Sequence, residues 1–175
     1  EEIYISNMDF EKANQLTNNL INLCFQDKAQ DKNAKIMHRF LGAATPNGAE
    51  DFIQNLTEDI TKRYFIKGRA GSGKSTMLKK IAAAGEARGF DVEVYHCGFD
   101  PNSLDMLIMR ELGIAIFDST APHEYYPERE TDEIIDMYES CIKPGTDETY
   151  AMEINRTTTA YKDKMKEAIT YLAEA

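Results

Sequence analysis

Short apolar runs, each followed by a polar or glycine-rich segment, recur through the middle of this chain. The runs at 64–66, 91–97 and 113–118 are rich in aromatic and β-branched residues, which favour buried strands. A shorter run at 38–42 precedes Thr-Pro-Asn-Gly at 45–48, a sequence typical of a turn. The pattern predicts a strand at each of these runs.

Between the predicted strands, apolar residues recur at intervals of three and four, which is typical of helices. This spacing predicts helices over 9–25, 52–60, 75–88, 104–109 and 131–142, and a last long helix from about 147. Strands alternating with helices predict a parallel sheet covered by helices.

Residues 68–75 match the pattern G-x-x-x-x-G-K-[ST], the Walker A or P-loop motif, between a predicted strand and a predicted helix. Glycines let the backbone approach an anion, and the N–H groups of the loop and helix N-terminus then point at one place. Lys74 is expected between the β- and γ-phosphates, and the Ser75 hydroxyl is expected on Mg²⁺. The predicted ATP-binding residues are Gly68, Arg69, Ala70, Gly71, Ser72, Gly73, Lys74, Ser75 and Thr76. The motif predicts the α/β fold class of a P-loop NTPase, with a parallel sheet flanked by helices.

The apolar run 113–118 ends in Asp118, the form of a Walker B strand whose acid holds hydrated Mg²⁺. His123 follows in a loop, where it can orient a water, contact phosphate or stabilise the loop by a hydrogen bond. The predicted catalytic residues are therefore Lys74, Asp118 and His123, and the predicted metal ligands are Ser75 and Asp118.

Ligands of parallel sheets bind beyond the carboxyl ends of the strands. We therefore expect 68–75, 98–100 and 118–123 to face one site. The candidates to neutralise transition-state charge are Arg69, Arg110 and Arg129, although each is also a candidate surface residue.

Charge and cysteine content narrow the function classes. A net charge of −10 argues against a general nucleic-acid or membrane-surface binder. The segment 62–80 nevertheless carries seven Lys or Arg and no acid, which surrounds the predicted phosphate site with positive charge. Three cysteines far apart in the chain predict no disulfide framework and favour a reducing cytoplasm. No apolar run is long enough to span a bilayer, so no membrane partner is expected.

From residue 38 onward the chain resembles a little-characterised family of bacterial tandem P-loop ATPases. The resemblance lies in HRFLGAATP at 38–46, RYFIKGRAGSGKS at 63–75, YHCGFDPNSLD at 95–105 and FDSTAPH at 117–123. It implies ATP binding and a companion P-loop module in a longer chain. Where such proteins usually have Pro, this loop has Ala70.

The polar segment 26–35 is typical of a linker. We expect residues 1–35 to be a leading helix and linker from a preceding module, and 36–175 to be the nucleotide-binding domain. The alternative is that the leading helix belongs to the core of the same domain.

Three functions fit these patterns. The first is an ATPase that hydrolyses or senses Mg-ATP as a switch. Motor-like and AAA-type ATPases often carry Glu directly after the Walker B acid, and Ser119 at this position predicts weak hydrolysis. The second is a small-molecule or nucleotide kinase, with Asp118 or Asp100 near the acceptor hydroxyl. The third is an architectural module that binds ATP without turnover. A GTPase is not favoured, because no N-K-x-D run is present.

Overall fold

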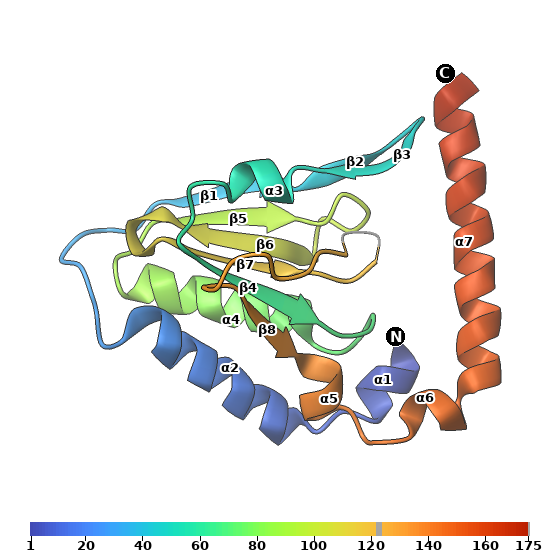
Figure 1. The fold of residues 1–175 in the computed structure, drawn as a ribbon, viewed down its shortest axis with the longest axis horizontal. Helices are drawn as coiled ribbons and strands as arrows, with labels where there is room; N and C mark the ends of the chain where they lie inside the picture. The colour runs from blue at the N-terminus through green and yellow to red at the C-terminus, as the bar shows by residue number, and fades with distance from the viewer. Residues whose placement is uncertain (122–123, 175) are drawn as a thin grey trace.

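The computed structural model describes residues 1–121 and 124–174. Its centre is a six-stranded sheet with the order β1-β5-β6-β7-β4-β8 (Figure 1). The strands are β1 (Ile36–Phe40), β4 (Lys62–Lys67), β5 (Val92–His96), β6 (Leu104–Met109), β7 (Ile114–Asp118) and β8 (Glu133–Asp136). The strands predicted at 64–66, 91–97 and 113–118 are confirmed as β4, β5 and β7.

The sheet is mixed, because β6 runs antiparallel to both of its neighbours, β5 and β7. The pairs β1–β5, β4–β7 and β4–β8 are parallel. The predicted fold class, a P-loop NTPase with a parallel sheet flanked by helices, is therefore wrong for this sheet. The error arose at 104–109, which form a strand and not a helix. The links 97–103 and 110–113 are too short for a parallel crossover, which needs about a dozen residues or more.

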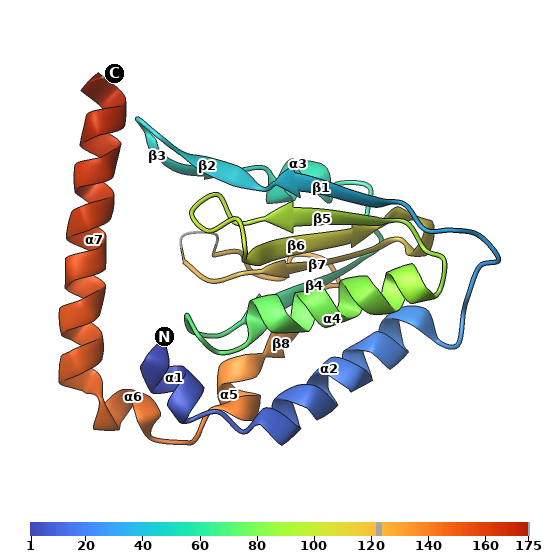
Figure 2. The same cartoon turned by 180° about the vertical axis from the view of Figure 1, so that it is seen from behind.

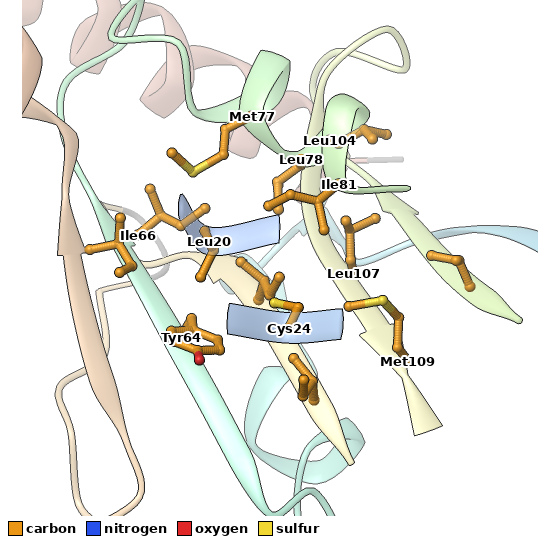
Figure 3. Close-up of a cluster of buried hydrophobic side chains, with 14 of the residues drawn as sticks. Leu20, Cys24, Tyr64, Ile66, Met77, Leu78, Ile81, Leu104, Leu107 and Met109 are labelled. Atoms are coloured by element: carbon orange, nitrogen blue, oxygen red, sulfur yellow. The ribbon is translucent and has the colours of Figure 1, made fainter. Parts of the chain in front are cut away.

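One face of the sheet is covered by α2 (Phe10–Phe25) and α4 (Lys74–Ala87) (Figure 2). Asp9 caps α2 by accepting a hydrogen bond from the Lys12 N–H at 3.0 Å. Side chains of both helices meet those of the sheet in the buried cluster of Figure 3, which includes Leu20, Cys24, Leu78, Ile81, Tyr64, Ile66, Leu107 and Met109. This packing fixes α4, and with it the loop that precedes α4.

The opposite face has little helical cover. The helix predicted over 52–60 is the single turn α3 (Ile53–Leu56), and the Phe52 side chain beside it is 61% exposed. A second buried cluster fills this face, with Leu41, Ile53, Ile60, Phe65, Tyr95, Met106, Ile108, Ala115 and Phe117. The hairpin of β2 (Gly42–Thr45) and β3 (Gly48–Asp51) continues outward from β1 (Figure 1).

A buried ion pair fixes the chain that enters β8. The Arg63 guanidinium of β4 donates to both Asp132 oxygens, from Nε at 2.9 Å and from Nη2 at 2.6 Å. Both side chains are fully buried. Asp132 Oδ2 also accepts hydrogen bonds from the N–H groups of Glu128 and Arg129. The segment before β8 is therefore held by one carboxylate.

The helix predicted over 131–142 is replaced by β8 and the short α5 (Met137–Cys141). Its apolar spacing suits a helix, but pairing of 133–136 with the edge of β4 determines the structure. A 3₁₀ turn, η1 (Arg110–Leu112), joins β6 to β7. After α5, the chain ends with α6 (Thr146–Thr149) and α7 (Ala151–Glu174).

Helix α7 lies beside the end of the sheet at which β4 and β5 have their carboxyl ends. The short α1 (Glu2–Ser6) lies near the start of α7 (Figures 1 and 2). None of the described residues of α7 is buried. No helix in the described part of the chain combines the length and apolarity that crossing a bilayer requires.

Candidate functional site

The loop 68–75 joins β4 to α4, as the Walker A motif predicts. Gly73 is the N-cap of α4 and has φ +86°, a left-handed conformation that glycine adopts without steric cost. A Cβ at Gly68 would collide with Ser72 Oγ. The buried Ser72 hydroxyl in turn accepts the Arg69 N–H at 3.2 Å, which braces the loop from inside.

Lys74 lies between this loop and the end of β7. Its side chain is 8% exposed, and Nζ donates to the Arg69 carbonyl oxygen at 2.8 Å. Nζ also lies 3.6 Å from Asp118 Oδ2. Lys74 and Asp118, two of the predicted catalytic residues, are therefore in contact although they lie on different elements. The third, His123, lies outside the described residues.

The amino end of β6 reaches the same place. The Leu104 N–H donates to Ser75 Oγ at 2.9 Å, which ties β6 to the first turn of α4. The next residue, Asp105, is 6% exposed and lines the cleft together with Asp118. Asp105 was not predicted as a site residue, because 104–109 was taken for a helix. The signal that could have identified Asp105 is its position as a single acid inside an otherwise apolar run.

A cleft of about 980 Å³ opens in front of the loop and lies within the size range of small-molecule sites. Predicted residues that line it are Ala70, Gly71, Gly73, Lys74, Ser75, Thr76 and Asp118. Gly68 and Arg69 line an adjoining pocket of about 450 Å³, which also includes Lys67, Thr120 and Asp136. The cleft includes residues from the β5–β6 link and Tyr161 of α7. The three segments expected to face one site therefore meet here, as far as the described residues extend.

The segment after Asp118 is held by a compact set of hydrogen bonds. Asp118 Oδ1 accepts from the Thr120 N–H at 3.0 Å and from its hydroxyl at 2.6 Å. Ser119 is fully buried, and its Oγ donates to the Tyr125 carbonyl oxygen and accepts the Tyr125 N–H. Lys67 Nζ donates to the carbonyl oxygens of Ser119 and Tyr125 at 2.7 and 2.8 Å. Burial lowers the pKa of the Lys67 ammonium, and nearby acids partly oppose that shift.

The three candidate arginines have structural partners. Arg69 pairs with Asp147 at 3.0 Å and stacks on the Tyr138 ring. Arg110 pairs with Glu93 and Asp59. Arg129 donates to the Ile60 carbonyl oxygen at 2.7 Å. Arg110 and Arg129 are not among the residues that line the cleft.

His96 is the last residue of β5, and Cys97 begins the link to β6. His96 Nε2 lies 2.8 Å from His38 Nδ1, whereas Cys97 lines the cleft. Burial raises the pKa of the Cys97 thiol, which disfavours the reactive thiolate form.

The donor set fits a hard divalent cation. Ser75 supplies a hydroxyl oxygen and Asp118 a carboxylate, and Mg²⁺ takes oxygen ligands, retains waters and usually binds with substrate phosphates. Within residues 1–121 and 124–174, no group of three or more His, Cys, Asp and Glu side chains could hold a metal. Any Mg²⁺ here would therefore draw ligands from phosphate and water as well as from Ser75 and Asp118.

Comparison with known proteins gives no relative. No protein-family model, curated protein or solved structure matches the chain.

Proposed function

We propose that the protein binds Mg-ATP at residues 68–75 and hydrolyses or senses it as a nucleotide-dependent switch. The observation that carries this proposal is the position of Lys74. Its ammonium is almost fully buried at the N-terminus of α4, between a loop carbonyl oxygen and Asp118. Burying an ammonium costs several kcal/mol unless it is paired. A triphosphate entering the cleft can take over this pairing, because the helix N-terminus and loop N–H groups favour the same anion.

Slow turnover is part of this proposal. Ser119, at the position where motor-like and AAA-type ATPases often carry a water-activating glutamate, instead forms hydrogen bonds with the backbone of Tyr125. Arg110 and Arg129 are engaged elsewhere in the fold. Groups that commonly accelerate hydrolysis are therefore bound in structural contacts at these positions.

The segment 119–125 is the part of the site suited to a switch. Lys67, which precedes loop 68–75, donates to the carbonyl oxygens of Ser119 and Tyr125, and the Thr120 hydroxyl donates to Asp118. Contacts with γ-phosphate and Mg²⁺ order such segments in other nucleotide switches, and hydrolysis releases them.

A kinase is the second candidate, and the extent of the cleft favours it. Beyond the loop, the cleft continues along the β5–β6 link, where Asp100, Asn102 and Ser103 line it. These polar groups could hold the hydroxyl-bearing acceptor of a phosphoryl transfer. An architectural module without turnover is the third candidate.

Thermal unfolding with Mg-ATP tests the binding site. A ligand at about a hundred times its Kd adds roughly 2.7 kcal/mol of stability. For a chain of this length, that is a rise in Tm of about 5–10 °C. Lys74→Ala should abolish most of the rise, whereas Lys166→Ala on the exposed face of α7 should retain it. An unchanged rise in Lys74→Ala would refute the assignment of the phosphate site.

Measuring ADP release with and without candidate acceptors then separates the three functions. Slow release without an acceptor supports the ATPase, and acceptor-dependent release supports the kinase. Binding without release supports the architectural module.

The companion module and the cytoplasmic location are also part of the proposal. They derive from the family resemblance and from the free cysteines Cys24, Cys97 and Cys141. Mass analysis of thiol labelling in the protein isolated from its cells would test the reducing compartment.

A further inference from the structure

A carboxylate that the proposed function does not yet use lies beside the loop. Asp105 is the second residue of β6, and its side chain is 6% exposed. Charged side chains are seldom this deeply buried. The neighbouring Cys97 side chain, which also lines the cleft, is hydrogen-bonded to Asp105. The hydrogen bond from the Leu104 N–H to Ser75 Oγ places the backbone of Asp105 next to the predicted metal-binding hydroxyl.

The ladder between β6 and β7 brings Asp105 to Asp118. The ladder ends with the pair Met106–Phe117, and Asp105 and Asp118 are the residues directly beyond that pair on the two strands. Paired residues on adjacent strands direct their side chains to the same face. Leu107 and Ile116, two residues further along, both belong to the cluster beneath α4. Asp105 and Asp118 therefore share the face from which α4 and its loop approach, and both line the cleft.

An irregularity in β6 occurs at the same position. Tyr95 pairs with Met106, but its neighbour His96 pairs with Leu104, so Asp105 is an extra residue in β6. Such bulges redirect a side chain and occur frequently beside active sites. The chain thus interrupts a regular strand at the residue that carries the buried acid.

We propose that Asp105 is a second carboxylate of the Mg²⁺ site, acting with Asp118 through waters on the cation. This inference rests on the proposed function, since Mg²⁺ would arrive with ATP. One or two carboxylates with substrate phosphates form the usual protein environment of Mg²⁺. Lys74 Nζ already lies 3.6 Å from Asp118 Oδ2, and a cation bound with the phosphates would add positive charge beside the two carboxylates.

The test measures nucleotide affinity at increasing Mg²⁺ concentration, with a fluorescent ATP analogue as probe. Loss of a partner one shell from a metal typically weakens metal affinity about 10- to 100-fold. Asp105→Asn should raise the Mg²⁺ concentration for half-maximal tightening by this factor and leave affinity in EDTA unchanged. Asp105→Glu, which retains the charge, should restore part of the Mg²⁺ dependence. Asp59→Asn, an exposed acid paired with Arg110, is the control and should match the wild-type protein.

A second readout uses Mn²⁺ in place of Mg²⁺, with the relaxation of water protons reporting the bound ion. Asp105→Asn should reduce Mn²⁺ binding to the nucleotide complex. Thermal unfolding without ligand establishes that each variant folds.

Three results would overturn the inference. Unchanged Mg²⁺ dependence in a folded Asp105→Asn protein would show that Asp105 does not act on the metal. If that variant also loses turnover, Asp105 acts as a base instead. Equal weakening in EDTA would show that Asp105 only positions Ser75. If the wild-type protein fails to bind Mg-ATP, the proposed function fails first and this inference fails with it.

Discussion

Replacing Asp132 by Asn should destabilise the fold severely, because Asp132 is the buried partner of Arg63. The variant keeps the shape of the side chain but removes the negative charge and one acceptor oxygen. The Arg63 guanidinium would remain fully buried, with Gln54 Oε1 at 3.2 Å as its other hydrogen-bond partner. The single amide oxygen of Asn can replace either Oδ1, which accepts from Arg63 Nε, or Oδ2, which accepts from the N–H groups of Glu128 and Arg129, but not both.

The expected loss follows from that geometry. Breaking a buried pair by removing one partner costs about 3–5 kcal/mol. For a chain of this size, the loss corresponds to a fall in Tm of about 6–20 °C. Asp59→Asn is the matched control, because Asp59 also pairs with an arginine but both partners are exposed. Exposed pairs contribute about 0–1 kcal/mol.

Urea unfolding followed by circular dichroism measures the free energy of unfolding of both variants. The Arg63 guanidinium, together with the two backbone donors, holds the pKa of Asp132 well below its ordinary range. Stability from the pair is therefore fully present above about pH 4 and is lost as the pH falls toward the lowered pKa. The difference between wild type and Asp132→Asn should shrink below about pH 4. A difference below about 1 kcal/mol at pH 7, similar to that of the exposed pair, would refute the reasoning.

Two further predictions concern the nucleotide. Asp118→Asn should weaken Mg-ATP binding but not metal-free ATP binding, since it removes a charge that attracts the cation and repels the phosphates. Calorimetry in Mg²⁺ and in EDTA measures the two affinities. Equal weakening under both conditions would show that Asp118 has a structural role. Hydrogen exchange across 119–130 should be slower with a non-hydrolysable ATP analogue than with ADP, since γ-phosphate contacts order such segments. Equal protection by the two nucleotides would contradict the switch.

The loop 68–75 is the part of the candidate site that the sequence predicts best, because its conformation is determined locally. Gly73 must adopt positive φ at the start of α4, and the apolar residues before it form β4. Asp118 was also predicted correctly as the end of a strand. These features depend on residues within a few positions of one another, so the motif alone determines them.

Features that depend on distant pairing were missed. Residues 104–109 are buried on both faces, and an apolar run of that length does not distinguish a strand from a helix. What identifies 104–109 as a strand is its pairing with β5 and β7, which no local pattern shows. Because that strand was missed, its residue Asp105 was not placed at the site. The partners of Arg69 and Arg129 come from segments far away in sequence, so no local pattern indicated their structural contacts.

The reversed strand also has a consequence for how the chain folds. The β5–β6–β7 meander pairs segments separated by short links, whereas β1–β5 and β4–β7 join segments far apart in sequence. Local pairings have a smaller loop-closure cost, and proteins rich in them fold faster. Asp105 and Asp118 therefore lie on strands that can associate before β4 pairs with β7 and brings the following loop and Lys74 to the cleft. Leu107→Ala in β6 should accordingly slow folding, and a purely accelerated unfolding in stopped-flow measurements would show that the meander forms late.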